Sequence, residues 1–227
     1  MSFFLPKHTF KLLGLSLSLV SAFAACSPTL NSPAARPVLT AQATPKNLPW
    51  FPTQQGYRWD YDVSIAPVMD PDAIDKGTYH LSVDRVAPSA NGDLIELRGL
   101  SGFNNRYTFP SLIQNPQGVT LQDMTFLGIG SDEVKGLQIP LIKMPLQVGQ
   151  RWETNEWLAK VKGPETITVP AGRFETMKIE VIGTFEHEYT AVGDYWFSPG
   201  KGLIKAVYTV PDFHVEMLLT QTGLKRP

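Results

Sequence analysis

Cysteine is almost absent from this chain: the 227 residues contain a single one, Cys26, near the amino terminus. A disulfide within the chain is therefore excluded, and the folded part must be stabilised by its core. An excess of charge is missing too, because 20 basic residues stand against 21 acidic ones and the formal net charge is -1. Without a basic stripe, nucleic acid is a poor candidate for a partner.

The short motifs of enzyme chemistry are also missing. The chain has no G-x-S-x-G, no H-E-x-x-H, no phosphate-binding loop and no dinucleotide fingerprint. Glu153 and Glu156 lie beside Trp152 and Trp157, as paired carboxylates do in sugar-cleaving sites, but their opposite strand parity predicts that they face apart. We therefore expect a protein that is not an enzyme and has no cofactor. A surface hydrolase acting on envelope polymers, using Glu153 or Glu156 with His187, is the alternative.

Two segments look like metal sites but lack the required geometry. The Glu186–Glu188 segment reads Glu-His-Glu, and on a strand His187 would point away from both glutamates. Asp70, Asp72 and Asp75 lack both the spacing and the final glutamate of a calcium loop. We expect a solvated strand edge and an acidic turn, with no metal bound at either.

The amino terminus has the layout of a secretory signal. Lys7 and Lys11 flank an apolar run over Leu12–Phe23, which is too short for a confident membrane span, and two alanines follow. The arrangement resembles the lipobox of bacterial lipoproteins, with Phe23 where leucine is usual, and the resemblance implies that Cys26 carries the lipid. An ordinary signal peptide with an incidental cysteine is the alternative.

Three regions are predicted. Residues 1–25 are a lipoprotein signal peptide, and residues 26–49 are the lipidated cysteine with a flexible linker rich in Pro, Ala, Ser and Thr. An ordered edge segment is the alternative for the linker. Residues 50–227 form a β domain, long enough for one core. We expect a cell-envelope protein, lipid-anchored in the membrane and facing the periplasm or the outside. Ser27 favours the outer membrane where the cell has one.

Strand and turn signals fill the rest of the chain. The residues from Tyr57 to Ile65 alternate between apolar and polar, and the Glu165–Tyr208 stretch reads as several strands separated by turns at Pro170–Gly172 and Ser198–Gly200. No segment outside the signal has a helical period. We predict an all-β fold, a single antiparallel meander of about ten strands that forms a barrel or a strongly curved half-barrel.

Two less regular segments are interpreted as follows. Gly128–Gly149 contains two prolines and is interpreted as a loop that crosses an open end of the sheet. Gln150–Leu158 is interpreted as one strand that carries Trp152 and Trp157.

A resemblance rests on the turns and their flanking strands. The sequences VPAGRFETMKIEV, YWFSPGKGLIKAVY and PLQVGQRWE resemble a family of uncharacterised bacterial secreted proteins and lipoproteins. Its domain of unknown function carries VPAG-x-F and Y-x-x-PG-x-G turns. The resemblance covers Pro145 to about Tyr208 and implies strands joined by these turns. No catalytic residue is carried over with it.

Aromatic residues are the candidates for a binding site. We expect seven of them to line the barrel interior, either as ordinary core or as the wall of a cavity for a hydrophobic molecule: Tyr57, Trp59, Tyr61, Tyr79, Trp152, Tyr195 and Phe197. The favoured hypothesis is an envelope lipoprotein that binds a hydrophobic ligand or a partner protein without catalysis.

Overall fold

The computed structural model describes residues 48–103, 105–123, 135–154, 157–185 and 189–224. These residues belong to one compact unit, Ala41–Pro227. They contain no helix and form 13 antiparallel strands in a nearly closed barrel with one unsealed seam. The predicted all-β fold is therefore confirmed, with more strands than the ten or so expected.

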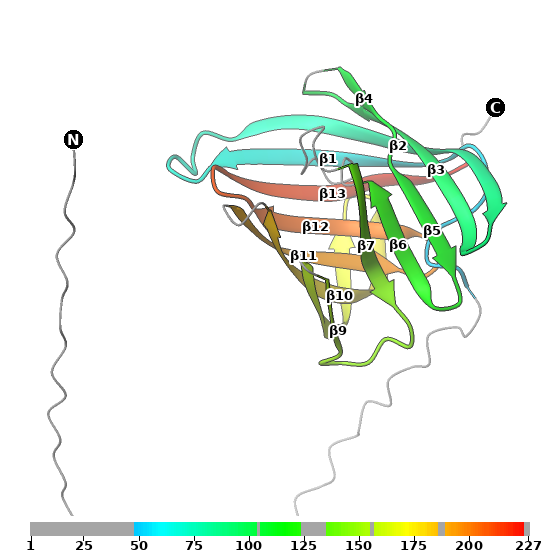
Figure 1. The fold of residues 1–227 in the computed structure, drawn as a ribbon. Helices are drawn as coiled ribbons and strands as arrows, with labels where there is room; N and C mark the ends of the chain where they lie inside the picture. Colours follow the sequence, from blue (N-terminus) through cyan, green and yellow to red (C-terminus); the bar gives the residue numbers. More distant parts are fainter. Residues whose placement is uncertain (1–47, 104, 124–134, 155–156, 186–188, 225–227) are drawn as a thin grey trace, which may run out of the picture. The chain divides into compact units, whose positions relative to one another are not determined.

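The strands follow one another along the chain (Figure 1). Their bounds are β1 Tyr57–Pro67, β2 Asp75–Ser89, β3 Gly92–Ser101, β4 Arg106–Thr108, β5 Ser111–Asn115, β6 Gly118–Asp123, β7 Lys135–Lys143, β8 Arg151–Thr154, β9 Trp157–Val169, β10 Gly172–Phe185, β11 Tyr189–Ser198, β12 Gly202–Thr209 and β13 Phe213–Leu224.

The order of the strands explains both the curvature and the seam. Across the sheet it runs β7-β6-β5-β3-β2-β1-β13-β12-β11-β10-β9-β8, with β4 paired only to β3. The first and last strands of the chain, β1 and β13, therefore pair in the middle of the sheet, and β7 and β8 form its two edges. Figure 1 shows the sheet curling so that these edges approach each other. A sheet of this size closes on itself because strand twist accumulates across it.

Side chains bridge the seam where backbone pairing stops. The indole Nε1 of Trp152 on β8 donates to the carbonyl oxygen of Pro140 on β7 at 2.6 Å. Near the same edge, Gln150 Nε2 donates to the carbonyl oxygen of Lys143 at 3.4 Å. Pro140 lacks an N–H and cannot complete a ladder, so a proline at this edge also limits pairing with other chains.

Replacing the bridging tryptophan should weaken the seam. In Trp152→Phe the aromatic ring stays and the Nε1 donor is lost, which leaves the Pro140 carbonyl oxygen without this partner. We expect a loss of about 1 to 3 kcal/mol in the free energy of unfolding. Urea unfolding measures the loss, and amide hydrogen exchange should locate faster opening at β7. Unchanged stability and exchange would show that the bond contributes nothing to closure.

The core is formed by the apolar residues that alternate with polar residues along the strands. In β1, Tyr57, Trp59, Tyr61 and Val63 are buried, and the residues between them face outward. The other strands also contribute inward side chains, most of them by the same alternation, and these form one hydrophobic cluster. Burying such side chains stabilises the domain in proportion to the apolar area removed from water.

Two predictions about local structure were wrong. Gly128–Gly149 is not wholly a loop, because β7 lies within it and pairs with β6. That pairing has two register shifts, and Ile139, Leu141 and Ile142 are all buried, so no period of two shows in the sequence. Gln150–Leu158 is not one strand either. It is divided between β8 and β9, which pair with Thr154 opposite Trp157.

The VPAG turn anchors a long hairpin to a distant strand. Val169 pairs with Gly172, and the N–H of Ala171 donates to the carbonyl oxygen of Leu219 on β13 at 2.9 Å. Glu165, on the same hairpin, accepts a hydrogen bond from the buried indole of Trp196 at 2.8 Å. The tip of this β9–β10 hairpin therefore reaches past β11 and β12 to contact β13.

Candidate functional site: an aromatic interior with one filled end and one apolar end

The seven candidate aromatic residues all lie in or against the hydrophobic core cluster. Six are buried, and Tyr79 on β2 is half-buried. They come from four strands, β1, β2, β8 and β11. Of these, only β1 and β2 are paired with each other. The position in the interior is as predicted, and it is compatible with both core filling and a cavity wall.

Hydrogen bonds to the backbone fix the polar atoms of these rings. Trp59 Nε1 donates to the carbonyl oxygen of Lys201 at 2.5 Å, and the Tyr61 hydroxyl donates to that of Leu203 at 2.9 Å. Both bonds tie β1 to the start of β12, 142 residues away. Buried aromatic residues with satisfied polar atoms act as fixed parts of a fold.

Burial also controls the charge of the interior tyrosines. Loss of solvation raises the pKa of Tyr61, Tyr195 and Tyr208 above the ordinary tyrosine value, and the neighbouring tyrosines add to the effect. Tyr195 and Tyr208 stack with ring centroids 6.3 Å apart. All three therefore stay neutral, and the interior offers neutral hydroxyl groups and ring surfaces.

The amino-terminal segment of the domain fills one end of this interior. Phe51 is 1% exposed and lies edge-on to both Trp59 and Phe197, with ring centroids 6.2 Å apart in each case. The buried side chain of Gln114 holds its backbone: Gln114 Oε1 accepts from Phe51 N at 2.7 Å, and Gln114 Nε2 donates to Phe51 O at 3.0 Å. The side-chain amide of Gln114 therefore takes the place of a neighbouring strand.

Glycines of the SPGKG turn make room for this segment. Gly202 has φ +82°, and a Cβ there would lie 2.9 Å from two ring atoms of Phe51. Gly200 N donates to the carbonyl oxygen of Pro49 at 2.8 Å. Glycine at this turn therefore lets the segment approach the backbone closely. Glycine also adopts the positive φ of the turn without strain. The strand pattern of the sequence carried no signal of this contact.

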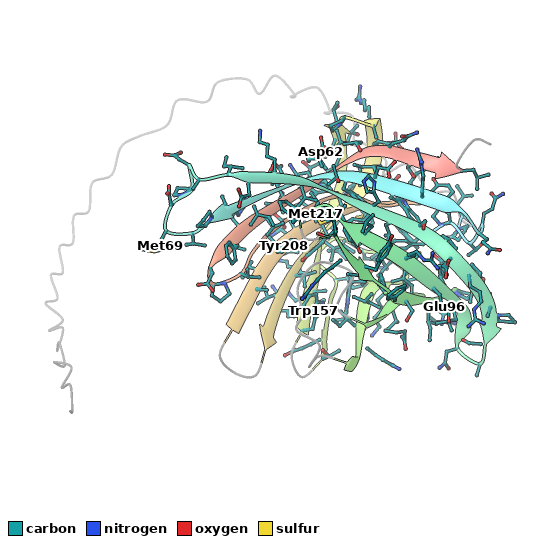
Figure 2. The ribbon with its side chains drawn as sticks, turned by 90° about the horizontal axis from the view of Figure 1, so that it is seen from above. Asp62, Met69, Glu96, Trp157, Tyr208 and Met217 are labelled. Carbon is teal, nitrogen blue, oxygen red and sulfur yellow. The ribbon has the colours of Figure 1, made fainter. Side chains whose placement is uncertain are left out.

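The opposite end of the domain exposes apolar side chains. The β1–β2 loop and the turn between β12 and β13 meet there, since Val68 N donates to the carbonyl oxygen of Asp212 at 2.9 Å. Figure 2 shows Met69 at the outer tip of the β1–β2 loop. We define the end patch as four residues with their exposed fractions: Val68 44%, Met69 94%, Ile74 51% and Phe213 43%.

Four carboxylates lie close in sequence to the residues of the end patch. Asp70, Asp72, Asp75 and Asp212 are all exposed, and Lys76 is the cation beside them. Among the described residues, none of these four carboxylates forms an ion pair. The surface there is both apolar and negative. The same acidic turn was expected to hold no metal.

The remaining candidates are placed only in part. Cys26, Glu156 and the Glu186–Glu188 segment lie outside the described residues. Glu153 is exposed on β8 beside the buried Trp152. Within the described part of the chain, no three His, Cys, Asp or Glu side chains are grouped so that they could hold a metal ion.

None of the described residues forms an apolar helix of a length that could span a bilayer.

Two solved structures share this fold. One is a provisionally described exported protein with a YmcC-like fold from Bacteroides fragilis NCTC 9343, with TM-score 0.57 and 13% identity over 78% of this chain and 100% of that one. The other is a provisionally described lipoprotein from Parabacteroides distasonis ATCC 8503, with TM-score 0.52 and 15% identity over 78% and 99%. No family model and no curated protein matches the sequence. The likeness shows a shared fold, and the family resemblance of the turn motifs stays a prediction.

Proposed function

We propose that this protein is a lipid-anchored component of the cell envelope that binds a partner protein through its end patch, without catalysis. The observation that carries the proposal is the exposure of Val68, Met69 and Ile74 on the β1–β2 loop and of Phe213 at the start of β13, two segments linked by a backbone hydrogen bond at one end of the barrel. Exposed apolar side chains that gather at one end of a domain among polar residues are typical of interaction surfaces.

The charges favour a protein over a lipid bilayer as the occupant of the end patch. The two loops and the start of β2 carry four carboxylates that form no ion pair with any described residue, and Lys76 is the cation beside them. Anionic lipid headgroups would be repelled by them. A partner segment with apolar and basic side chains would match both properties, and such complementarity speeds association and selects partners.

The filled end of the interior favours a partner protein over a hydrophobic ligand. Phe51 occupies the space between Trp59 and Phe197, where an apolar ligand of the predicted kind would lie. The polar atoms of Trp59 and Tyr61 are already bound to the backbone. A ligand in this region would have to displace the protein's own side chains.

The envelope location is supported by the signal and by the two structural neighbours. Cys26 stands where bacterial lipoproteins carry their lipid, and the neighbours are described as an exported protein and a lipoprotein. Pro49 lies at the Phe51 end of the domain, where its carbonyl oxygen accepts from Gly200 N, and the end patch lies at the opposite end.

The test is photo-crosslinking in living cells with the full-length lipoprotein. A benzophenone amino acid at Met69 should give one or a few discrete protein adducts, whereas the same probe at Leu224, which is 48% exposed at the other end, should not. Ile74→Asp adds a charge beside the probe and should abolish the Met69 adducts at unchanged expression. Three outcomes would each refute the proposal. The probe at Leu224 could give the same adducts as the probe at Met69, Ile74→Asp could leave the Met69 adducts unchanged, or the adducts could contain lipid in place of protein.

A further inference from the structure

A groove with an unusual lining lies at the Phe51 end of the domain, on the outer face of β5, β6 and β7. Its volume is about 660 Å³, and the turns that follow β2 and β5 border it. None of its ten lining residues can ionise. Six carry amide or hydroxyl side chains: Asn91, Asn115, Gln117, Thr120, Gln122 and Gln138.

Close contact between two hairpin turns shapes the groove. Gly92 has φ +128°, and a Cβ there would lie 2.5 Å from the carbonyl oxygen of Gln114. Because Gly92 has no side chain, the two turns touch, and Asn115 Nδ2 donates to the carbonyl oxygen of Asn91 at 2.6 Å. Asn115 Oδ1 also accepts from Gln117 N at 2.8 Å. Asn115 is therefore fixed, and this wall exists before any ligand arrives.

The strand face of the groove offers free donors and acceptors. Gln138 Nε2 donates to Gln122 Oε1 at 3.3 Å. This single bond leaves the Gln122 Nε2 donor and the Gln138 Oε1 acceptor without a partner among the described residues, and the same is true of the side-chain amides of Asn91 and Gln117. Half-buried Ile113 and Thr120, paired across β5 and β6, lie between them. Polar edges thus surround a small apolar floor.

We propose that this groove binds a neutral saccharide. Each sugar hydroxyl both donates and accepts a hydrogen bond, as each side-chain amide does, and the C–H face of a sugar ring suits the Ile113 floor. A charged ligand would find no opposite charge in the lining. An apolar ligand would leave the amides without hydrogen bonds when it covered them, which is costly. Binding here is independent of the end patch, which lies at the other end of the barrel.

The test uses the whole β domain as part of the soluble chain from Ser27, labelled with ¹⁵N. Neutral oligosaccharides of glucose, galactose, mannose and N-acetylglucosamine are titrated into it, with galacturonate oligomers as the charged comparison. At least one neutral sugar should shift the side-chain amide signals of Gln122 and Gln138 saturably. The Gln147 amide, on an exposed loop, should not shift. Added salt should leave the affinity unchanged.

Variants separate recognition from folding. Gln122→Ala with Gln138→Ala should weaken binding at least tenfold, while Gln147→Ala should bind as the unaltered chain does, and all should keep the same backbone spectrum. The proposal is overturned by the absence of any saturable shift with the neutral sugars. Galacturonate oligomers that bind as tightly as the neutral sugars would also overturn it. An unaltered affinity for the neutral sugars in the double variant would do the same.

Discussion

Phe51→Ala should destabilise the β domain by roughly 3 to 5 kcal/mol, the range for removing a buried phenylalanine ring. The ring is 1% exposed and contacts Trp59 and Phe197 from the barrel interior, so its removal leaves a cavity that the surrounding strands can fill only in part. A loss of this size is a large fraction of the roughly 5 to 15 kcal/mol that stabilises a typical domain. Urea unfolding followed by tryptophan fluorescence measures it.

A matched substitution tests whether the effect belongs to the site. Phe109→Ala removes the same ring from a position that is 64% exposed, and it should change stability by no more than about 0.5 kcal/mol. Equal losses in the two variants would contradict the view that the amino-terminal segment is part of the core. A Phe51→Ala protein as stable as the unaltered one would show that the segment only rests on the surface.

Cys26→Ala should move the protein from the membrane fraction to the soluble fraction and abolish its labelling by palmitate. Acyl chains contribute about 0.8 kcal/mol for each buried methylene, and stable anchoring needs more than one membrane-binding signal. Fractionation after a carbonate wash and metabolic labelling with an alkyne fatty acid measure the two outcomes.

A second variant avoids confusion with an uncleaved signal. Joining residues 27–227 to a signal peptide from an ordinary secreted protein should give a mature, unlabelled and soluble product. An unaltered chain that carries no label and is itself soluble would favour the alternative, an ordinary signal peptide with an incidental cysteine. A membrane-bound product without Cys26 would point to an anchor elsewhere in the chain.

The sequence predicted most of the strands because their residues alternate. In β10, Ile179 and Val181 point inward and are buried, as the pattern indicated. Turns were predictable because proline and glycine have restricted or special backbone conformations, as at Pro170–Gly172. β7 was missed because its irregular pairing with β6 buries Leu141 and Ile142 in succession, which no period of two describes.

The candidate sites were predictable only in part. The sequence alone determined the all-β class, the inward position of the aromatic residues and the lack of recognised catalytic motifs, since each follows from local pattern. Only the tertiary structure placed Phe51 against Gln114, or Val68 beside Asp212, residues 63 and 144 positions apart in the chain. Contacts at such separation depend on how the whole sheet curls, and curvature is a property of accumulated strand twist, which no single segment of the sequence encodes.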